Sequence, residues 1–371
     1  MKVMFDHQIF TVQRYGGFTK YFVALSRALR NTPGIETEIV APAYINEYLM
    51  ADDSRSALTF RLRHPKRGLK YRPLLAAPLF RMAAQWQRPD IIHETHYLLR
   101  GCQLPAAVPV MATCHDMILE RQADGSARSR DAVDRKQQAF ERASGIICIS
   151  EHTRTDLLQY YPRFESRVSV VYHGVDRIEP MASVGRSLPS SYLLFVGMRD
   201  GYKNFANAVR AMGASRLVRE NYHLVCFGGG PLSTIERQMC VDAGLKADKV
   251  VQLTGDESLL AFAYQNAAAL VYPSKYEGFG MPLTEAMAQG CPVLCSHASC
   301  FPEICADAAQ YFDPDSVESI RHATEQLLED EARQSELVAL GRQRAAAFTW
   351  QSCAEGTAAA YGKALARHAV H

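Results

Sequence analysis

Two glutamates flank a glycine-rich segment in the second half of the sequence, in the run Glu277-Gly-Phe-Gly-Met-Pro-Leu-Thr-Glu285. A carboxylate can accept hydrogen bonds from two adjacent sugar hydroxyls, and such charge-assisted bonds are strong. Gly278 and Gly280 allow a ligand to approach the backbone, and the helix opened by Pro282 presents free N–H groups to an anion. The run therefore predicts a phosphate site with a sugar-binding carboxylate on each side, as a nucleotide sugar requires. The same residues could instead form a strand-to-helix turn with solvent-facing glutamates.

Two cations come earlier in the chain, after a predicted strand over residues 192–196. Arg199 and Lys203 follow that strand, with Gly197 and Gly201 beside them. Cations in such a loop can offset the charge of a diphosphate leaving group as its bond to a sugar breaks, without any proton transfer. Either residue alone could be an ordinary surface cation. Their pairing at the carboxyl end of a strand favours the functional interpretation.

A histidine and a glycine pair in the first half occupy comparable positions. His115 follows the predicted strand 110–114, where an imidazole can hydrogen-bond a sugar hydroxyl or carry a proton. A histidine in such a turn can equally be structural. Gly16 and Gly17 precede the predicted helix 19–30 and permit close approach of a ligand, although a Gly-Gly pair alone is a weak signal.

Short apolar strands alternate with helix-length segments along the whole chain, which is typical of parallel sheets with crossover helices. The predicted strands cover residues 2–5, 38–41, 90–93, 110–114, 146–149 and 168–172 in the first half, and 192–196, 224–227, 250–253, 269–272, 293–295 and 310–312 in the second. Helices are predicted over residues 19–30, 131–143, 283–289, 316–328, 331–348 and 351–367. We therefore expect an α/β fold with two Rossmann-like, doubly wound domains.

The domain boundary is predicted from the stretch 173–189, which contains two glycines and two prolines and breaks both periodicities. The expected organisation is an N-terminal domain, a linker, a C-terminal domain and a helix that crosses back to the N-terminal domain, over residues 1–173, 174–190, 191–348 and 349–371. Folds of this kind bind ligands outside the carboxyl ends of their strands, so a central cleft between the domains is the expected site.

Taken together, these motifs resemble the glycogen-synthase-like retaining glycosyltransferases of family four, which have the GT-B fold. The resemblance covers nearly the whole chain. It rests on Gly16-Gly17, His115, the linker after His173-Gly174-Val175-Asp176, the pair Arg199 and Lys203, and the Glu277-to-Glu285 motif. The cation pair and the two-glutamate motif are its specific parts. The family implies that the N-terminal domain binds the acceptor and the C-terminal domain binds the nucleotide sugar.

The resemblance also implies a role for each matching residue. Glu277 resembles the residue that contacts hydroxyls of the donor hexose, and Glu285 the one that binds the ribose hydroxyls. Arg199 and Lys203 match the cations of the diphosphate site, and His115 matches a histidine near the transferred sugar. Further donor contacts are implied for the loop glycine Gly17, for Gly255 and Asp256 at the nucleobase, and for the backbone N–H groups of Phe279, Gly280 and Met281.

In chemistry, the resemblance implies retention of anomeric configuration without a divalent metal or other cofactor, with the leaving phosphate deprotonating the acceptor. It favours GDP-mannose over a UDP-hexose as donor, and a glycan or lipid-linked oligosaccharide of bacterial surface-polysaccharide and lipopolysaccharide synthesis as acceptor. Residues 200–202, between Arg199 and Lys203, lie where family members vary, so the wall beside the hexose is not predicted.

Composition is that of a soluble globular protein, with 371 residues of which 48% are hydrophobic and 22% charged. The N-terminus lacks the apolar region of a secretory signal, and no stretch approaches the ~20 apolar residues of a membrane span. A cytosolic protein is therefore expected. The ten cysteines show no CxxC spacing and no partners at zinc-site distances, so we expect reduced core thiols.

A basic segment lies between Asp53 and Asp90, which enclose no other acidic residue. Its cations are Arg55, Arg61, Arg63, Lys66, Arg67, Lys70, Arg72, Arg81 and Arg88. With apolar neighbours such as Met82 and Trp86, this segment could contact an anionic membrane or a lipid-diphosphate acceptor. It could also be a solvated basic face over a core helix. Nucleic acid is not expected as a partner, because aromatic residues do not alternate with the cations.

Several other classes compete with this interpretation. A dinucleotide oxidoreductase is disfavoured because the run Gly228-Gly-Gly230-Pro lacks the GxGxxG spacing. Asp313-Pro-Asp315 could bind a metal, but a turn in which Asp315 caps the next helix is favoured. His93-Glu-Thr-His96 is too short for a zinc-binding HExxH helix. A hydrolysing sugar-nucleotide epimerase of the same architecture and a non-catalytic sugar-binding protein remain alternatives.

Overall fold

The computed structural model describes residues 1–50, 59–61, 72–99, 107–122, 124–180, 188–199 and 201–369. The chain divides into two compact units. Unit 1 comprises Met1–Gly174 together with Trp350–His371, and unit 2 comprises Val175–Thr349. The C-terminal helix therefore belongs to the N-terminal unit, and the predicted linker over residues 174–190 begins at the boundary between the two units.

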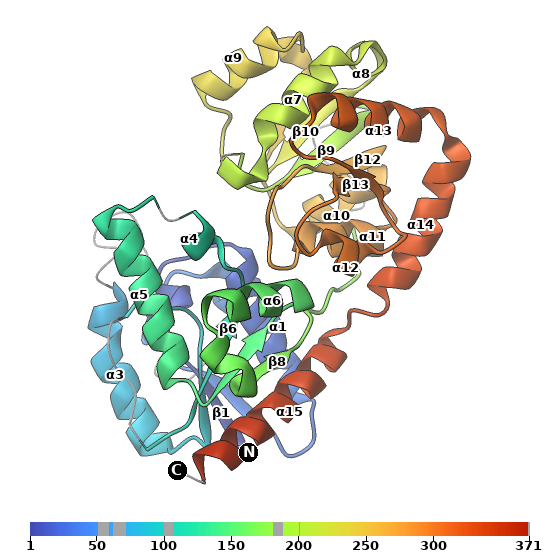
Figure 1. Ribbon diagram of the computed structural model, residues 1–371. Coiled ribbons are helices and arrows are strands. Elements are labelled where there is room, and N and C mark those ends of the chain that lie inside the picture. Colours follow the sequence, from blue (N-terminus) through green and yellow to red (C-terminus); the bar gives the residue numbers. More distant parts are fainter. Residues whose placement is uncertain are drawn as a thin grey trace. The chain divides into compact units, whose positions relative to one another are not determined.

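Unit 1 is built on a parallel six-stranded sheet in the order β2-β1-β5-β6-β7-β8, of which Figure 1 labels β1, β6 and β8. Its strands are β1 (Lys2–Phe5), β2 (Glu36–Ile39), β5 (Ile91–Glu94), β6 (Val110–Cys114), β7 (Gly145–Cys148) and β8 (Val168–Val170). Two short strands, β3 (Ala43–Tyr44) and β4 (Phe60–Arg61), pair separately. The strand order reverses between β1 and β5, and ligands of doubly wound sheets bind beside such a switch point.

The helices of unit 1 cover this sheet and include the last helix of the chain. They are α1 (Gly17–Arg30), α2 (Glu47–Met50), α3 (Arg72–Gln87), α4 (Ile118–Arg121), α5 (Ala127–Arg142), α6 (Glu151–Tyr160) and α15 (Trp350–His368). Trp350, Ala354 and Tyr361 of α15 join Tyr21 and Leu25 of α1 in one buried apolar cluster. This burial explains why the C-terminal helix is part of unit 1, because it completes the core beside α1.

Unit 2 repeats the same plan with a parallel six-stranded sheet in the order β11-β10-β9-β12-β13-β14. Its strands are β9 (Tyr192–Val196), β10 (His223–Phe227), β11 (Val250–Leu253), β12 (Ala269–Tyr272), β13 (Val293–Ser296) and β14 (Gln310–Phe312). The strands β9, β12 and β13 are buried along their whole length, as expected for strands covered by helices on both faces. Here the switch point lies between β9 and β12, the two strands that precede the predicted cation and glutamate loops.

The helices of unit 2 lie on both sides of its sheet (Figure 1). They are α7 (Phe205–Ala214), α8 (Arg216–Asn221), α9 (Thr234–Asp242), α10 (Glu257–Asn266), α11 (Met281–Gln289), α12 (Phe301–Cys305), α13 (Val317–Glu329) and α14 (Glu331–Ala345). Gly341 of α14 lies against Met287 of α11, where a Cβ atom at Gly341 would meet the Met287 side chain at 3.1 Å. Close packing on α14 thus fixes the helix that follows the glycine-rich loop.

The predicted α/β fold with two doubly wound sheets is confirmed, with shifts at the element ends. The strand predicted over 38–41 is β2, which begins two residues earlier, where Glu36 pairs with Lys2. The first residues of β2 are polar, so the apolar pattern in the sequence does not reveal them. The helix predicted from residue 131 is α5, which begins four residues earlier, where the Ser126 hydroxyl accepts a hydrogen bond from Ser129 N–H at 3.1 Å.

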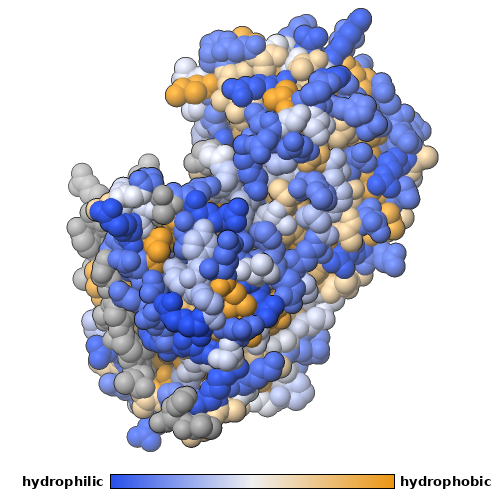
Figure 2. Space-filling view, viewed as in Figure 1, coloured by the Kyte–Doolittle hydropathy of each residue, from blue (hydrophilic) through white to orange (hydrophobic). Residues whose placement is uncertain are grey.

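The cysteine prediction is confirmed for the described residues, in which all nine cysteines are free and buried. Cys102 lies outside the described residues. Among the helices of the described part, none is long and apolar enough to cross a membrane. The face drawn in Figure 2 is mostly hydrophilic, with small apolar patches, one of them over α9.

Candidate functional site

The glycine-rich loop of unit 2 joins β12 to α11 and is shaped by Gly280. This residue lies at the N-cap of α11 with φ of +80°, a left-handed conformation that favours glycine. A Cβ atom there would also lie 3.0 Å from Leu283 and 3.1 Å from Phe301. Pro282 stands in the first turn of α11, as predicted. The loop thus turns tightly and directs the N-terminal N–H groups of α11 to its own side, where they can bind an anion.

Glu277 takes part in a closed set of three hydrogen-bonded side chains. Its Oε1 lies 2.5 Å from Lys203 Nζ and accepts a hydrogen bond from the Tyr272 hydroxyl at 2.9 Å. Lys203 Nζ in turn donates to the Tyr272 hydroxyl oxygen at 3.0 Å. The side chains of Lys203 and Glu277 are 14% and 13% exposed, so the pair is mostly buried but can be reached from solvent. The structure therefore brings together a predicted diphosphate cation and a predicted sugar carboxylate.

The loop that carries Lys203 is tied to the glycine-rich loop by its neighbours. Asn204 adopts a left-handed conformation with φ of +57°, and its Nδ2 donates to the backbone oxygens of Pro273 at 3.1 Å and Pro314 at 2.7 Å. The Lys275 N–H donates to the Tyr202 carbonyl at 2.8 Å. These bonds join the ends of β9 and β12, so they explain how Lys203 meets a residue 74 positions later. Asn204 is not among the predicted site residues, although asparagine is one of the residues that often adopts a left-handed conformation.

The backbone of Glu277 is fixed by a single hydroxyl. Ser299 Oγ donates to the Glu277 carbonyl at 2.5 Å and accepts a hydrogen bond from the Glu277 N–H at 3.1 Å. Ser299 itself has a φ of +54°, which costs energy for a residue that is not glycine. The loop after β13 therefore keeps the Glu277 backbone in place, and this residue too was missed by the sequence analysis.

Arg199 is almost completely engaged within unit 2. Its Nε donates to Glu236 Oε1 at 2.7 Å, and its terminal nitrogens donate to the carbonyls of Gly228 at 2.8 Å and Gly230 at 2.9 Å. The three consecutive glycines 228–230 all have positive φ, which turns their carbonyls toward the guanidinium. The run considered for dinucleotide binding is therefore a binding loop for Arg199. Arg199 delivers its charge beside this loop but has most of its hydrogen-bond donors already used.

Glu285 lies on α11 and receives a hydrogen bond from a buried tyrosine. The Tyr264 hydroxyl of α10 donates to Glu285 Oε2 at 3.2 Å. Tyr264 is only 1% exposed, and burial, with the Glu285 charge beside it, raises the pKa of Tyr264 well above its usual value. Its phenol therefore stays protonated and can only donate to the carboxylate.

The other residues of unit 2 that are predicted to contact the donor take part in local packing and helix capping. Asp256 is the N-cap of α10, where its Oδ1 accepts a hydrogen bond from Leu259 N–H at 3.0 Å. A Cβ atom at Gly255 would lie 2.4 Å from the Leu259 side chain. Phe279 is 2% exposed and packs edge-on to Phe348, and Met281 is the first residue of α11. The nucleobase and phosphate contacts of these residues stay predictions.

In unit 1, His115 lies in a cluster of aromatic rings at the end of β6. It is 5% exposed, and its ring stacks on Phe18 with centroids 4.1 Å apart and meets the edges of Tyr21 and Phe22. Within the described residues neither ring nitrogen has a hydrogen-bond partner. Burial, and then the nearby His173, lower the pKa of His115 well below its usual value. His115 is therefore a neutral imidazole with two buried ring nitrogens whose hydrogen-bonding capacity is unused within the described residues.

Gly17 is the first residue of α1 and lies directly before Phe18, the ring that stacks on His115. The Thr19 N–H donates to Gln13 Oε1 at 3.3 Å, and the Thr19 hydroxyl donates to the Gly16 carbonyl at 2.9 Å. These bonds fix the first turn of α1. The structure thus places two predicted features of unit 1, the glycine pair and His115, beside one another.

A buried lysine that the sequence analysis missed supports the His115 loop. Lys136 of α5 is 1% exposed, and its Nζ donates to the Asp116 carbonyl at 2.6 Å and to Glu120 Oε2 at 2.8 Å. Burial alone would lower the pKa of Lys136, but Cys114, Asp116 and Glu120 raise it overall, so the ammonium is charged. In a helix as rich in charged residues as α5, one buried lysine gives no sequence signal, because its partners come from another element.

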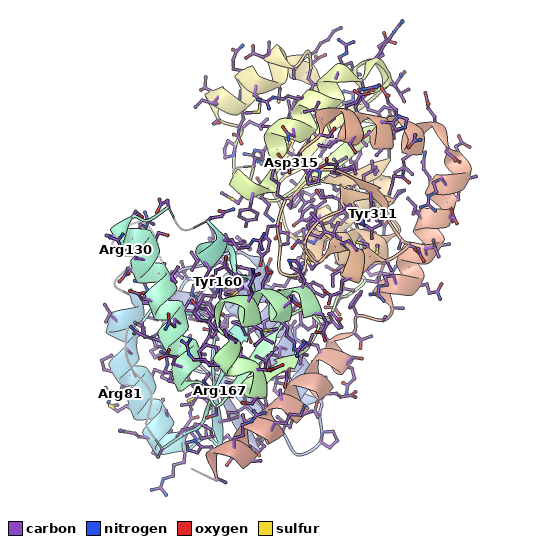
Figure 3. The ribbon with its side chains drawn as sticks, viewed as in Figure 1. Arg81, Arg130, Tyr160, Arg167, Tyr311 and Asp315 are labelled. Carbon is purple, nitrogen blue, oxygen red and sulfur yellow. The ribbon has the colours of Figure 1, made fainter. Side chains whose placement is uncertain are left out.

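Two of the disfavoured metal motifs serve structural purposes. His93 bonds the hydroxyls of Tyr361 and Thr113, each at 2.7 Å, inside the core of unit 1. The expectation that Asp315 caps α13 is wrong: the cap is Ser316, whose hydroxyl accepts from Ser319 N–H at 3.1 Å. Asp315, which Figure 3 labels, instead pairs with Lys275 through an exposed side chain. In the described part of the chain, no three metal-ligating side chains are grouped to hold an ion.

Comparison with known proteins assigns both halves of the chain to glycosyltransferases. Residues 15–178 match the model for Glycosyltransferase Family 4, and residues 176–344 match the model for glycosyl transferases group 1. The two models together cover the chain from residue 15 to residue 344. The chain belongs to these glycosyltransferases, and its two doubly wound sheets form the GT-B fold.

Individual relatives agree with this family. O-antigen chain mannosyltransferase B of Escherichia coli is 27% identical over 236 residues, which are 60% of this chain and 62% of that protein. The serotype-specific mannosyltransferase WbdA of Escherichia coli is 28% identical over 295 residues, 72% of this chain but 36% of that protein. The chain thus matches about three fifths and one third of their lengths. The structure of HepE from Anabaena with UDP and glucose superposes with a TM-score of 0.74 and 16% identity, over 97% of this chain and 98% of that one.

Proposed function

We propose that the protein transfers a hexose, with retention of configuration, from a nucleoside-diphosphate sugar to a hydroxyl of a glycan or lipid-linked glycan in surface-polysaccharide synthesis. The observation that carries this proposal is the arrangement around α11. The Lys203–Glu277 pair precedes the glycine-capped N-terminus of α11, and Glu285 follows it on the same helix, at the switch point of the unit 2 sheet. A diphosphate at the helix end would place sugar hydroxyls within reach of both carboxylates.

In this proposal each charged residue of unit 2 has one task. Glu277 binds hexose hydroxyls, and Glu285 binds the ribose. Lys203 moves from Glu277 to the diphosphate and stabilises the negative charge that grows as the sugar–phosphate bond breaks. Arg199, with its donors bound to Glu236 and the glycine loop, contributes its positive charge and fixes that loop. The departing phosphate oxygen accepts the proton of the acceptor hydroxyl, whose oxygen forms the new bond to the sugar.

His115 has a different task, set by its lowered pKa. Because the imidazole is neutral, it can donate a hydrogen bond from one nitrogen and accept one at the other. We propose that it hydrogen-bonds a hydroxyl of the transferred sugar and does not shuttle a proton. His115→Phe would keep the stacking on Phe18 and lower kcat about tenfold or more, with unchanged thermal stability. A pH–rate profile that loses an ionisation in this variant would contradict the hydrogen-bonding role.

The donor is proposed to be GDP-mannose, with a UDP-hexose as the competing candidate. Mannosyltransferases among the relatives support mannose, while the solved relative with UDP and glucose supports the competitor. The experiment is a thermal-shift series with GDP, UDP, GDP-mannose and UDP-glucose. A ligand present at a hundred times its Kd adds about 2.7 kcal/mol to stability, so the correct nucleotide stands out.

Metal independence is part of the proposal, because Arg199 and Lys203 supply the positive charge that a divalent ion would otherwise provide at the diphosphate. Transfer by the purified protein should be unchanged after chelation with EDTA. Activity that disappears on chelation and returns with Mg²⁺ or Mn²⁺ would overturn this point.

Contact with an anionic membrane is proposed through α3, which exposes several large apolar side chains. Leu79, Met82 and Trp86 follow helical spacing and are 44%, 65% and 79% exposed. Arg81 lies on the same helix and is exposed (Figure 3). Five of the nine cations in the basic segment 55–88 lie outside the described residues, and their charge is known from the sequence. Exposed aromatic and aliphatic residues beside cations are typical of interfacial helices.

The membrane proposal is tested by co-sedimentation with vesicles of phosphatidylcholine alone and with added phosphatidylglycerol. Binding should require the anionic lipid and weaken in Trp86→Ser. Equal recovery of the protein with both vesicle types would contradict the membrane proposal. This result would not affect the proposed transfer reaction.

The transfer reaction itself is tested with purified protein and radiolabelled donor. Donor should be consumed only when an acceptor glycan is present, and Glu277→Ala should abolish transfer while the fold survives. Release of free sugar in the absence of acceptor would indicate a hydrolysing epimerase. Donor binding without any turnover, together with normal cellular function of Glu277→Ala, would indicate a sugar-binding protein.

A further inference from the structure

We propose that two buried tyrosines, Tyr272 and Tyr264, are positioning residues that divide donor recognition between hexose and nucleoside. Each hydroxyl donates to one carboxylate of the two-glutamate motif, Tyr272 to Glu277 and Tyr264 to Glu285. This inference rests on the proposed function, in which Glu277 binds the hexose and Glu285 binds the ribose.

Tyr272 is the last residue of β12 and is 1% exposed, so its ring is fixed by the sheet. Its hydroxyl accepts a hydrogen bond from Lys203 at 3.0 Å and donates one to Glu277 at 2.9 Å. The ring also lies edge-on to Phe301, with centroids 5.6 Å apart. The phenol thus stands on a rigid element and contacts both members of the ion pair.

The task of Tyr272 follows from what happens to Lys203 when a donor binds. A diphosphate carries more negative charge than Glu277 and attracts the ammonium away from the carboxylate. Glu277 then keeps the hydrogen bond from Tyr272, which preserves its orientation toward the hexose. Burial, together with the Glu277 charge, raises the pKa of Tyr272 well above its usual value, so the phenol remains a donor throughout.

Tyr264 does the corresponding task from a different element. It lies in α10, is 1% exposed, and donates to Glu285 Oε2 at 3.2 Å. Because Tyr264 is buried, its phenol keeps a fixed direction and orients the Glu285 carboxylate through this hydrogen bond. The two tyrosines thus act on two carboxylates that belong to different parts of the donor.

The test uses Tyr272→Phe and Tyr264→Phe, each of which removes one hydroxyl and leaves the ring. Dissociation constants are measured by calorimetry for a nucleoside diphosphate and its sugar, using GDP with GDP-mannose and UDP with UDP-glucose. In Tyr272→Phe the ratio of the affinity for the nucleotide sugar to the affinity for the bare nucleoside diphosphate should fall roughly tenfold. In Tyr264→Phe both affinities should weaken by the same factor, so that their ratio stays as in the wild type.

The matched control is Tyr192→Phe in the same unit. Tyr192 is fully buried, and its hydroxyl donates to the Ala263 carbonyl at 2.7 Å, so this variant loses a buried hydrogen bond that touches neither carboxylate. Its melting temperature should fall as in the other two variants, while both dissociation constants stay at wild-type values. A purely structural role for Tyr272 and Tyr264 predicts that all three variants behave alike.

Two outcomes overturn the inference, and they are distinguishable from failure of the proposed function. The inference fails if Tyr272→Phe and Tyr264→Phe change the two affinities in the same ratio, or if neither differs from Tyr192→Phe. The proposed function fails if the wild type binds none of the four nucleotides and transfers no sugar. Loss of transfer in Glu277→Ala with wild-type behaviour of Tyr272→Phe sinks the inference alone.

Discussion

The two units use the same sheet plan but build opposite kinds of polar site. At the end of β6 in unit 1, His115 is neutral, surrounded by rings, and has no hydrogen-bond partner among the described residues. At the ends of β9 and β12 in unit 2, Lys203 and Glu277 are charged and already paired with one another. The first site offers unused hydrogen bonds, and the second offers charges that neutralise each other until a ligand takes one of them.

The difference has a physical reason. A buried histidine avoids the cost of burying charge by losing its proton, so it does not need a charged partner. A lysine and a glutamate that must both stay charged need each other, because an isolated buried ion costs far more than a paired one. Neutral recognition of sugar hydroxyls fits the first environment, and recognition of a diphosphate sugar fits the second.

The largest effect is expected from the buried charge that supports the neutral site. Lys136→Met removes the ammonium between the Asp116 carbonyl and Glu120 and leaves a buried carboxylate unpaired. Loss of one partner of a buried pair should lower the free energy of unfolding by roughly 3–5 kcal/mol. Chemical denaturation measures it, with Arg128→Met, an exposed cation of the same helix, as the control. Equal losses in both variants would show that Lys136 is not a buried support.

The charged site should respond through activity more than through stability. Lys203→Ala removes the cation that we propose binds the diphosphate, and kcat should fall about a hundredfold or more. The control is Lys275→Ala. Lys275 lies two residues before Glu277, and its ammonium pairs with Asp315. Steady-state kinetics on both proteins make the comparison. Wild-type kcat in Lys203→Ala would exclude the proposed role.

Acidic pH should weaken the neutral site through its histidines. Burial lowers the pKa of His93 and His173 to about 3, and that of His96 to about 4. Below about pH 6.5 the unfolded chain binds protons at these positions and the folded chain does not, so stability falls as the pH falls. The slope is about 1.4 kcal/mol per pH unit for each histidine. Glu94 opposes it, because burial raises its pKa to about 7 and the folded carboxyl gains its proton first.

Denaturation midpoints at pH 7, 6 and 5 measure this slope. The net effect should be a loss of stability toward pH 5, since three histidines oppose one carboxyl. His322→Gln, at an exposed position of α13, should have the same slope as the wild type. A midpoint that stays constant from pH 6.5 to 5 would contradict neutral burial of these rings.

The smallest effect is expected at Asp256, which caps α10 in unit 2. Asp256→Ala should cost about 1 kcal/mol of stability, because Leu259 N–H loses its acceptor. Asp256→Asn should recover most of that loss, since Asn is also a good N-cap. Thermal unfolding measures both. Wild-type stability of Asp256→Ala would show that the cap contributes nothing.

Much of the fold could be predicted because its strands are apolar on both faces. The strands β6, β9, β11, β12 and β14 match their predicted bounds, whereas the edge strand β2 was placed two residues late. The strand β2 begins with the polar residues Glu36, Thr37 and Glu38, so its apolar pattern is weaker. The Ser316 cap was missed for a similar reason, because Asp315 and Ser316 are both good caps and only the backbone geometry distinguishes them.

The sequence by itself determined the residue types of the site and the strand ends on which they stand: two glutamates, two cations and one histidine. Only the tertiary structure decided their partners. In the folded protein Lys203 and Glu277 both hydrogen-bond Tyr272, and Arg199 bonds Glu236 and the glycine loop. His115 packs among aromatic rings. The reason is physical: strand and helix periods are local, whereas burial and pairing of polar groups depend on residues far away in the chain.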